Sequence, residues 1–403
     1  MNQIITEKPF RQPFLSQFVL VSSLLPFLDN EMQKLNSDLD LYEQLFLNPD
    51  IEKNLISKNE LLASFAISKA ENSTLTLPEA QDVYDLILQN EDYTFFREKL
   101  KVHKKLTQKD YDKLEFYNIA KTFRNYNKNP VHINDVTPGY IIDLHKQLTQ
   151  GLDIFEKHLP DFNVYKAGNW RDNDNIRIGE YRPAPYTEIK KSVTELLDWI
   201  KQSHTITSVG IFHTAFYALH PFNNGNKRVA RVLEHIFLRS LDTNKKNLYS
   251  TSYYYHKERE RYYKYLFYSL ERKNLNHFVS FFQEAFVLSI VSVIKTSLEA
   301  KRSDFLISRE TDDQVKMIFK PLIKRHEVQF KNLFKCVAKK MARQTFVNYL
   351  QQATDEGIVI RRDAGRATYY SLNVSPREEE TFHNLLNFVK TKLLFIPDDI
   401  KLA

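Results

Sequence analysis

Residues 220–231 read His-Pro-Phe-Asn-Asn-Gly-Asn-Lys-Arg-Val-Ala-Arg, and this stretch decides how the middle of the chain folds. Pro221 and the Asn-Asn-Gly run predict the end of one helix, and a second helix is expected to begin near Asn226. The first backbone N–H groups of a helix have no partner inside it, and the helix dipole adds positive potential there. The stretch therefore predicts an anion-binding loop suited to phosphate.

Side chains of the same stretch add chemistry to this loop. Arg228 and Arg231 are three residues apart, so they share one helix face, and their guanidinium groups suit polyphosphate oxygens. His220 lies directly before the loop, where a histidine with a pKa near neutrality can take a proton from an attacking hydroxyl. The combination predicts phosphoryl or nucleotidyl transfer, although His-Pro or Asn-Gly alone is an ordinary helix end or turn. His213, on the preceding helix, is interpreted as a packed histidine.

The composition predicts a mainly helical protein. Only 8 of the 403 residues are glycine, and Leu, Lys, Glu and Gln recur in amphipathic order, which favours long helices with short connections. Helices are expected at residues 59–71, 140–153, 187–202, 208–219, 227–241 and 257–270. In residues 175–186, NIRIGEYRPAPY, isoleucines alternate with other residues before two prolines, which predicts a short β-hairpin flap. The main part of the chain is therefore expected to be all-α with one hairpin.

The single cysteine and the N-terminal residues indicate a compartment. Cys336 alone excludes a disulfide framework and a metal site built from several cysteines, which fits a reducing environment. The first residues, MNQIITEKPFRQPF, lack the basic and apolar segments of a secretion signal, and no long uncharged apolar stretch follows. We therefore expect a cytoplasmic protein without a membrane partner.

The C-terminal part of the chain has a different pattern. A polar and charged segment, KTSLEAKRSD, predicts a linker near 301–310. Beyond it, 328–337 and 342–354 read as two helices in tandem. The β-prone runs 358–361 and 367–372 flank a turn-rich link. The order helix, helix, hairpin predicts a small C-terminal winged-helix-like α+β domain.

Charge and polar side chains give this domain two candidate roles. The net charge of the chain is +7, and the excess of Lys and Arg lies near the C-terminus. Residues able to read bases or contact phosphate lie on the second helix and the hairpin: Arg343, Gln344, Asn348, Gln351, Arg361, Arg362 and Arg366. One hypothesis is DNA binding through 342–370. The alternative is a protein contact or support for a homodimer, because winged helices also serve in these ways.

Residues 220–231 resemble the signature of the Fic family, His-Pro-Phe-x-Asp/Glu-Gly-Asn-Gly-Arg-x-x-Arg. The resemblance covers about residues 60–290, with further family landmarks in order: Leu144-His145, Gly168 to Arg171, the flap, and Ser252 with Tyr262-Tyr263. Fic enzymes typically transfer AMP from ATP to a Ser, Thr or Tyr hydroxyl of a target protein, with Mg²⁺ or Mn²⁺ on the phosphates. The resemblance therefore implies a mainly helical Fic fold and a protein adenylyltransferase with an unknown target protein.

The resemblance also implies roles for single residues. His220 would be the general base. ATP would be held by Gly225, Asn226, Lys227, Arg228, Arg231, His256 and Tyr263, the last two near the adenine. An extended target segment would dock on the flap residues Ile176, Arg177, Ile178 and Gly179.

Two residues depart from the family signature. Asn224 replaces the acidic metal ligand, and a neutral amide is a weaker ligand for Mg²⁺. Lys227 replaces the second glycine and brings a cation to the phosphate loop. The same Asn-Lys-Arg order occurs in Doc toxins, Fic relatives that act as kinases, so a Doc-type protein kinase is one alternative. The other is a non-catalytic Fic scaffold with a DNA- or protein-binding winged helix, which the retained His220 argues against.

An upstream segment resembles the helix that inhibits many Fic enzymes and ends in Ser/Thr-x-x-x-Glu-Gly/Asn. Residues 59–72 read NELLASFAISKAEN, and Glu71 stands in the place of the inhibitory glutamate. The hydroxyl residue expected four positions earlier is Ile67, and Ser68 follows it. Glu71 is expected to pair with Arg231 and to occupy the space of the γ-phosphate. The alternative is an ordinary surface glutamate in the last turn of a helix.

The predicted organisation has three parts. An N-terminal helical region covers residues 1–110 and includes the inhibitory helix, the Fic core covers 111–300, and the winged-helix-like domain with a C-terminal helix covers 301–403. With 22 Tyr residues the chain offers hydroxyl groups for self-modification, although tyrosines of a helical core usually serve packing.

Overall fold

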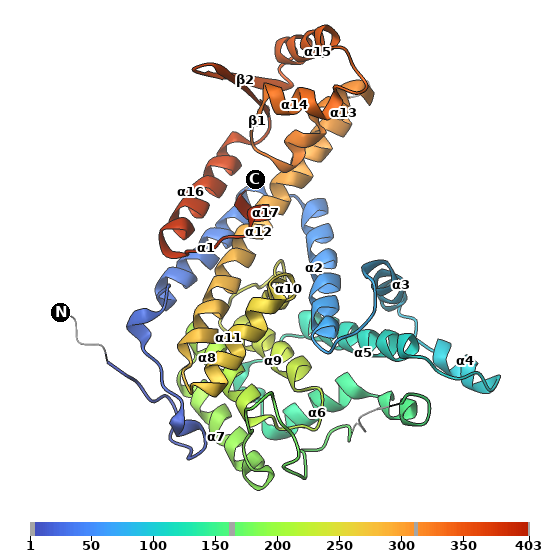
Figure 1. Cartoon of the computed structure of the whole chain (residues 1–403), viewed down its shortest axis with the longest axis vertical. Coiled ribbons are helices and arrows are strands. Elements are labelled where there is room, and N and C mark those ends of the chain that lie inside the picture. Colours follow the sequence, from blue (N-terminus) through green and yellow to red (C-terminus); the bar gives the residue numbers. More distant parts are fainter. Residues whose placement is uncertain (1–4, 161–165, 310–312, 402–403) are drawn as a thin grey trace. The chain divides into compact units, whose positions relative to one another are not determined.

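The computed structural model of the chain is mainly helical, as the sequence predicts (Figure 1). It describes residues 5–160, 166–309 and 313–401. The chain divides into two compact units, unit 1 with residues 1–36 and 56–289 and unit 2 with residues 37–55 and 290–403. The sheet found among the described residues is three-stranded and antiparallel, and it belongs to unit 2.

Unit 1 is built from helices, of which the first two and the last also extend into unit 2. Their bounds are α1 (Asp29–Phe46), α2 (Pro49–Lys69), α3 (Leu77–Leu88), α4 (Phe95–Lys101), α5 (Gln108–Lys128), α6 (Pro138–Thr149), α7 (Ile189–Gln202), α8 (Ile206–Leu219), α9 (Asn226–Ser240), α10 (Thr251–Lys257), α11 (Arg259–Glu271) and α12 (Asn276–Ser308). The helices predicted at 140–153, 187–202, 208–219 and 227–241 correspond to α6 to α9, with ends that differ by at most four residues.

Helix α8 leads the chain into the loop at residues 220–225 and is buried along its whole length. It is apolar on every side, as expected of a helix inside a core. Gly210 lets α8 lie close to α12, because a Cβ atom there would be 2.5 Å from Cδ1 of Phe282. By length and composition α12 could cross a membrane, yet 83% of its most apolar window is buried inside the protein. Both helices therefore belong to the core.

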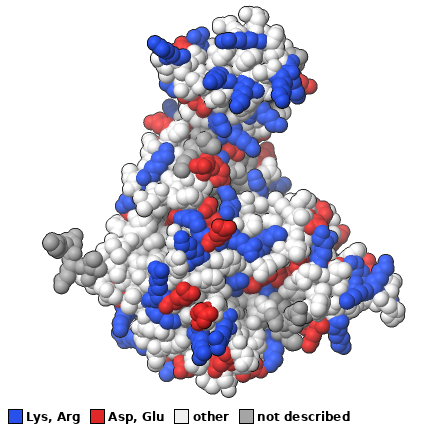
Figure 2. Space-filling view, viewed as in Figure 1, with Lys and Arg blue, Asp and Glu red and all other residues white. Residues whose placement is uncertain are grey.

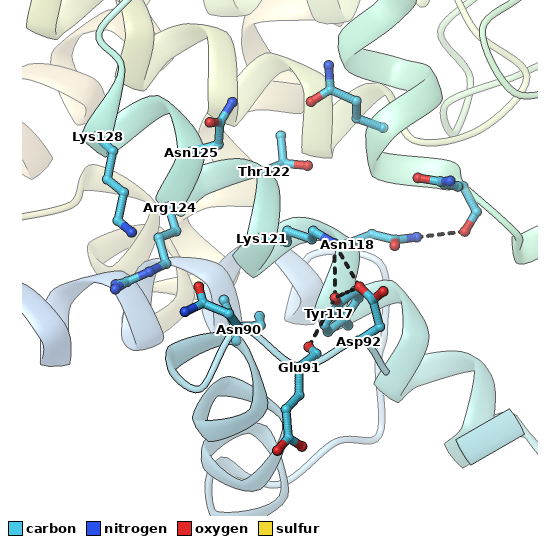
Figure 3. A pocket seen from close by; sticks show the side chains of 13 residues that line it. Asn90, Glu91, Asp92, Tyr117, Asn118, Lys121, Thr122, Arg124, Asn125 and Lys128 are labelled. Carbon is cyan, nitrogen blue, oxygen red and sulfur yellow. Dashed lines mark hydrogen bonds and ion pairs between the residues drawn. The ribbon is translucent and has the colours of Figure 1, made fainter. Parts of the chain in front are cut away.

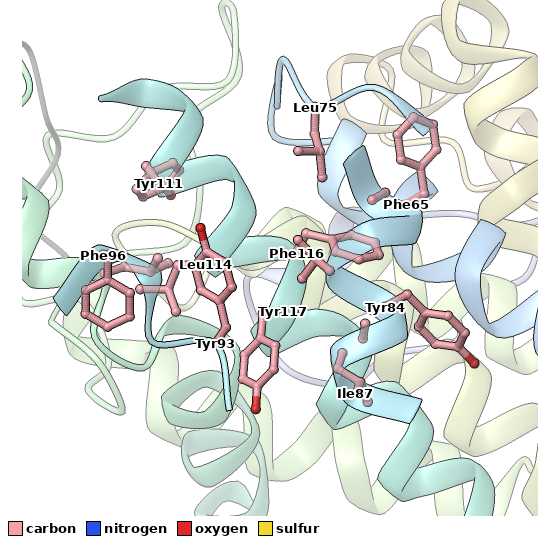
Figure 4. Close-up of a cluster of buried hydrophobic side chains, with 14 of the residues drawn as sticks. Phe65, Leu75, Tyr84, Ile87, Tyr93, Phe96, Tyr111, Leu114, Phe116 and Tyr117 are labelled. Carbon is pink, nitrogen blue, oxygen red and sulfur yellow. The ribbon is translucent and has the colours of Figure 1, made fainter. Parts of the chain in front are cut away.

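A cluster of buried aromatic side chains supports the C-terminal end of α2 (Figure 4). Phe65 of α2 packs in this cluster with Tyr84 of α3 and Phe116 of α5. Aromatic side chains bury roughly 150–250 Å² each, so such a cluster dominates local packing. The chain after α2 is tied to α5 as well, because the backbone N–H of Thr74 donates to Oδ2 of Asp112 at 2.6 Å. The end of α2 is thus held in place beside α5.

Unit 2 contains a winged-helix-like module. Its elements are α13 (Asp313–Lys324), β1 (Val328–Gln329), α14 (Phe330–Val337), α15 (Arg343–Asp355), β2 (Val359–Ala364) and β3 (Ala367–Leu372), and α16 (Pro376–Lys392) and α17 (Asp398–Lys401) follow. The strand order is β1-β3-β2, and β3 pairs antiparallel with both neighbours. Leu333, Phe346 and Leu372 are buried in one core between helices and sheet. Helices α14 and α15 and the hairpin lie where the sequence predicts them, whereas α13 and β1 were not predicted.

The linker expected at 301–310 is helical up to Ser308, and residue 310 lies outside the described residues. The segment KTSLEAKRSD contains no glycine or proline and is rich in good helix formers, so α12 continues through it. Arg302 is buried, and its Nη2 lies 2.8 Å from Oε1 of Glu379 in α16. Polarity alone was therefore a misleading sign of a linker.

Candidate active site

His220 ends α8 in a left-handed backbone conformation with φ of 50°. Its N–H donates to O of Phe216 at 3.1 Å, and its ring lies edge-on to Tyr217 with centroids 5.3 Å apart. Among the described residues the buried Nδ1 finds no hydrogen-bond partner. Burial lowers the pKa of His220 to about 3, although the charge of Glu71 acts in the opposite direction. The ring is therefore neutral at physiological pH and able to accept a proton.

Asn226, the first residue of α9, fixes the shape of the loop after His220. Its Nδ2 donates to O of Phe222 at 2.8 Å, and its Oδ1 accepts from the N–H of Phe222 at 2.9 Å. Gly225 precedes it with φ of 79°, a conformation that glycine adopts without steric cost. A Cβ atom at this glycine would also lie 3.3 Å from Nε2 of His145. The predicted anion-binding loop is therefore held by the side-chain amide of Asn226 and by the turn at Gly225.

Phe222 anchors the loop in an aromatic stack. Its ring lies parallel to that of His145, with centroids 3.9 Å apart, and it stacks on Trp170 at 4.9 Å. His145 accepts from the N–H of Gly168 at Nδ1 (3.0 Å), which assigns the ring proton to Nε2, and Nε2 donates to O of Asn224 at 3.1 Å. Burial lowers the pKa of His145 to about 4, so the ring stays neutral. This histidine supports the loop through packing and hydrogen bonds.

Arg171 joins the flap to His220. Its Nε donates to O of His220 at 2.8 Å, its Nη1 to Oδ1 of Asp174 at 2.9 Å, and its Nη2 to O of Ala184. Its backbone N–H donates to O of Pro221 at 2.9 Å. Arg171 is only 3% exposed, and a buried guanidinium needs such partners. The sequence indicates Arg171 only as a family landmark without a role, and the structure places it as a support of the loop after His220.

The predicted flap is a tight turn with a single bridged residue pair. Ile178 and Tyr181 exchange two backbone hydrogen bonds of 3.1 Å, and the prolines that follow cannot donate to a longer ladder. Of the predicted docking residues, Ile178 is buried, Ile176 is half-buried, and Arg177 and Gly179 are exposed. The hairpin expectation was therefore too long, and Ile178 faces inward in this structure.

Replacing Arg171 with alanine is expected to lower the free energy of unfolding by about 2 kcal/mol, because several carbonyl groups lose a charged donor at once. Urea unfolding followed by circular dichroism measures this change. The matched control is Arg182→Ala, which removes an exposed arginine of the same flap and is expected to change stability by less than about 0.5 kcal/mol. Equal effects of the two substitutions would contradict the supporting role of Arg171.

Arg228 lies between two carboxylates from different parts of unit 1. Its Nη1 is 3.0 Å from Oε1 of Glu115 in α5, and its Nε is 4.0 Å from Oε1 of Glu71 after α2. Nη2 lies 3.5 Å from Oδ1 of Asn224. Arg228 is fully buried, and a buried charge has to be paired. Arg228, which the sequence predicts to bind phosphate, is thus neutralised by carboxylates of unit 1.

The end of α2 and the turn after it contact the start of α9. We call these contacts the α2–α9 latch, and its members are Ala66, Ala70 and Glu71 on one side and Lys227, Arg228 and Arg231 on the other. Lys227 Nζ donates to O of Ala70 at 3.1 Å and lies 3.6 Å from Oε2 of Glu71. Desolvation opposes the charge of Glu71, but Lys227 and Arg228 hold its pKa below the usual value. The glutamate is therefore ionised in the latch.

The partner of Glu71 differs from the one predicted. Glu71 pairs with Lys227 and Arg228, whereas Nη1 of Arg231 donates to O of Ala66 at 3.0 Å. The guanidinium of Arg231 also lies over the ring of Tyr262, 4.6 Å from its centroid. Since Arg231 is one turn further along α9 than Lys227, it meets α2 one turn before its end. The expected pair of Glu71 with Arg231 was therefore wrong, although both residues belong to the latch.

The two residues predicted near the adenine also face the end of α2. The hydroxyl of Tyr263 donates to O of Ala70 at 2.9 Å, and Nζ of Lys227 lies 5.3 Å from the centre of its ring. His256 packs edge-on against Phe65 of α2, with centroids 5.5 Å apart. Tyr263 therefore contacts a residue of the latch, and His256 packs against α2.

His213 is a packed histidine, as the sequence predicts. It is fully buried, with Nδ1 2.6 Å from Oε2 of Glu234 and Nε2 3.2 Å from the hydroxyl of Tyr262. Because Tyr262 in turn lies under Arg231, this buried group supports the α9 side of the latch.

Glu115 of α5 belongs to the site and was not predicted. Oγ of Ser68 donates to its Oε2 at 3.2 Å, and the hydroxyl of Tyr111 donates to its Oε1 at 3.1 Å. Burial raises the pKa of Glu115 to about 7 against the attraction of Arg228, and the charge of Glu71 raises it further. The residue lies far upstream of the motif in a helix with no signature of its own. Only its contact with Arg228 in the fold reveals it.

Through Glu115, stability is expected to fall as the pH rises from about 4.5 to 7. The pKa of Glu115 is higher in the folded than in the unfolded state, so the native protein binds more protons across this window. Urea unfolding at about pH 5 and 7 should show a loss larger by about 1–2 kcal/mol in the wild type than in Glu115→Gln. Histidines with lowered pKa act in the opposite sense in both proteins and cancel in the difference. Parallel pH profiles would contradict this assignment.

At position 224, where the family signature has an acidic metal ligand, the loop offers a divalent cation only a neutral amide oxygen. Oδ1 of Asn224 accepts from the N–H of Gly225 at 2.7 Å and lies 3.5 Å from Nη2 of Arg228. Residues 220–226 contain no carboxylate. Within the described residues no group of three or more His, Cys, Asp or Glu could hold a metal ion. The residues present therefore do not fit a protein-held Mg²⁺ or Mn²⁺ site at Asn224.

A separate pocket lies beside α5 (Figure 3). Its volume of about 420 Å³ falls in the range of small-molecule sites, roughly 300–1,000 Å³. Three of its charged side chains already have partners, since Lys121 Nζ lies 3.0 Å from Oδ1 of Asp92 and Arg124 Nη1 lies 2.6 Å from Oε2 of Glu60. None of residues 220–231 lines this pocket, so it is distinct from the candidate active site.

Comparisons with known protein sequences point to the same segment. Residues 135–238, which include the loop, Arg171 and the flap, match the model of the Fic/DOC family. A probable protein adenylyltransferase of Aquifex aeolicus is 34% identical over 84 residues, which cover 20% of this chain and 26% of that protein. The match thus spans about a quarter of the length of this curated relative.

One solved structure supports the fold, and a second is similar at a lower score. A Fic family protein from Desulfovibrio desulfuricans has a TM-score of 0.50 and 18% identity, with 87% of this chain and 98% of that chain covered. A Fic domain-containing signalling protein from Bacteroides thetaiotaomicron has a TM-score of 0.48 and 17% identity, with 66% and 97% covered. Residues 135–238 of this chain thus form a domain of the Fic/DOC family.

Proposed function

We propose that this protein is a protein adenylyltransferase, which transfers AMP from ATP to a protein hydroxyl with His220 as general base and is restrained by the α2–α9 latch. The observation that carries the proposal is the buried, unpartnered Nδ1 of His220 directly before the loop and the start of α9. A buried ring nitrogen without a hydrogen-bond partner, beside an anion-binding loop, is the arrangement that nucleotidyl transfer needs. The name of the Aquifex relative supports AMP as the transferred group.

In the proposed reaction the hydroxyl oxygen of the target attacks the α-phosphorus of ATP. His220 takes the hydroxyl proton, the bond from the α-phosphorus to the bridging oxygen breaks, and pyrophosphate leaves. The ring is neutral beforehand because burial lowers its pKa to about 3. A bound triphosphate places negative charge beside the ring and raises that pKa towards the range of an efficient base. Substrate binding would therefore also tune the base.

The start of α9 would hold the triphosphate. Its first-turn N–H groups and the helix dipole favour an anion, and Lys227, Arg228 and Arg231 supply positive charge on the same helix. Because the loop residues do not form a metal site, we assign charge neutralisation to these three side chains. A divalent ion bound to ATP would add to it, and no step above depends on that ion.

The latch would keep the enzyme inactive at rest. Lys227 and Arg228 are engaged with Glu71, and Arg231 is engaged with Ala66. Side chains that hold α2 cannot at the same time hold phosphate oxygens in a productive way. Displacement of the end of α2 frees all three cations at once, so activity should follow the fraction of molecules with an open latch.

The exposed residues of the flap, Arg177 and Gly179, are the proposed docking point for an extended segment of the target. A second copy of the chain, transient or in a homodimer, can present such a segment, so self-modification is the simplest readout. We propose that the reaction takes place in the cytoplasm.

The experiment is intact-mass spectrometry of the Glu71→Gly protein after incubation with ATP and Mg²⁺ or Mn²⁺. An adduct with the mass of AMP supports the proposal. An adduct with the mass of phosphate would replace it with a Doc-type kinase. Absence of an adduct on the protein, together with no transfer of α-labelled phosphate to proteins of a cell lysate, would overturn the enzyme assignment in favour of a non-catalytic scaffold.

A further inference from the structure

We propose that the winged-helix-like module of unit 2 binds double-stranded DNA, with α15 in the major groove and the β2–β3 hairpin against the phosphate backbone. None of the residues involved belongs to the candidate active site, so DNA binding and AMP transfer can fail separately.

The positive charge of the chain is concentrated in this module. Residues 313–374 contain twelve Lys or Arg and five Asp or Glu, a net charge of +7, which equals the net charge of the whole chain. Figure 2 shows Lys and Arg side chains gathered on the surface of this module with few acidic side chains among them. The rest of the chain is therefore neutral in sum. A basic module on a neutral protein is the electrostatic pattern of nucleic-acid binding.

Several of these cations have no side-chain partner within the ranges that the structure covers. Lys331 and Lys335 lie four residues apart on α14, Lys339 and Lys340 lie in the connection to α15, and Arg366 lies beside the turn of the hairpin. All five are exposed, and none forms an ion pair or a side-chain hydrogen bond there. Unpaired surface cations can neutralise phosphates and release counterions from DNA.

Two other arginines of the hairpin, which the sequence also suggests as DNA contacts, form ion pairs within the module. Nη2 of Arg361 lies 3.2 Å from Oδ2 of Asp363, and Nη2 of Arg362 lies 2.6 Å from Oε2 of Glu327. These pairs stiffen the hairpin, and within its described residues 359–372 Arg366 is the cation without a side-chain partner. The phosphate contact is therefore assigned to Arg366 rather than to the paired arginines.

Helix α15 presents a polar face whose one acidic residue, Asp355, ends the helix and accepts from Nε2 of Gln351 at 2.9 Å. Residues 343–354 contain no Asp or Glu. Gln344, Asn348 and Gln351 are spaced along one exposed side of the helix, and Nε2 of Gln344 donates to Oδ1 of Asn348 at 3.1 Å. Phe346 faces the other way and is fully buried in the core of the module. Amide side chains on an exposed helix suit the adenine edge in the major groove.

The composition of this face favours DNA over a protein partner. A protein-docking surface has an apolar centre with a polar rim and few lysines. The large hydrophobic side chain exposed on α15 is Val347, 37% accessible, and the exposed Lys339 and Lys340 precede the helix. The exposed face of α15 therefore lacks an apolar centre and suits a negatively charged partner such as DNA.

The test is fluorescence anisotropy of a labelled duplex of about 25 base pairs with the full chain. Contacts to about four phosphates predict that affinity falls roughly 100-fold when the salt concentration rises from about 50 to 200 mM. The triple variant Lys339→Ala, Lys340→Ala and Arg366→Ala should bind more weakly and lose up to about three units of salt slope. His220→Ala should bind as the wild type does.

The matched control removes the same charge from unit 1, through alanine at the exposed residues Lys101, Lys104 and Lys105. It should leave the affinity for DNA unchanged. No binding at low salt, an equal loss in the control, or tighter binding of single-stranded RNA than of the duplex would each overturn the proposal.

Discussion

The Glu71→Gly protein is expected to transfer AMP roughly 10- to 100-fold faster than the wild type. The carboxylate that this change removes lies 3.6 Å from Nζ of Lys227 and 4.0 Å from Nε of Arg228. Charge-assisted contacts contribute about 1.5–3 kcal/mol, and each 1.4 kcal/mol corresponds to about tenfold in an equilibrium. Their loss would raise the fraction of open molecules by that factor. Initial rates with α-labelled ATP measure the change.

Two further variants make this prediction specific. Glu71→Gln keeps the size of the side chain and removes its charge, so its rate should lie between those of the wild type and Glu71→Gly. Glu156→Gly removes an exposed glutamate elsewhere in unit 1 and should leave the rate unchanged. A Glu71→Gly protein with the wild-type rate would show that the latch does not limit turnover.

His220→Ala in the Glu71→Gly background is expected to lower the rate by roughly 10²–10⁴-fold, the usual effect of losing a general base. The loop shape should survive, because the amide of Asn226 and the stack on Phe222 hold it without the imidazole. Nucleotide affinity, measured by isothermal titration calorimetry, should therefore stay within a few-fold of the parent. The loss would then belong to the chemical step.

The control for this change is His277→Ala, which removes a half-buried histidine outside the loop and should retain the parent rate. If the His220→Ala protein keeps most of the activity, another group takes the proton and the proposed base is wrong. If the His220→Ala protein loses nucleotide binding together with activity, the histidine is needed for the shape of the loop. The loss of activity would then count against a role limited to proton transfer.

The helices around the site were predictable because their apolar residues recur at helical spacing, and the turn at 221–225 carries proline, asparagine and glycine. The same local signals gave α14, α15 and the hairpin of unit 2. The local signals predicted a linker at 301–308, where the chain is helical. The charged residues there are good helix formers, and Arg302 pairs with the buried Glu379 only in the folded protein. The local signals also predicted too long a hairpin in the flap, because in so short a segment the sequence pattern of one bridged residue pair resembles that of a β-strand.

The contacts of the site were less predictable than its residues. His220, Lys227, Arg228 and Arg231 stand in one continuous motif, which local sequence can reveal. The partner Glu115 comes from a helix more than a hundred residues upstream, and no local pattern encodes such a pair. The position of α2 along α9 depends on packing between whole helices. This position places the carbonyl of Ala66, rather than the carboxylate of Glu71, beside Arg231.

Because the latch holds Lys227 and Arg228, it would also set how the protein responds to the concentration of ATP. If productive ATP and a closed latch compete for the same cations, the apparent dissociation constant equals the intrinsic one divided by the open fraction. With roughly 1% of molecules open, productive binding would be about 100-fold weaker than the loop itself allows. Linkage is reciprocal, so ATP must in turn weaken the hold of α9 on the end of α2. The wild-type protein would then act as a sensor whose threshold for ATP is set by Glu71.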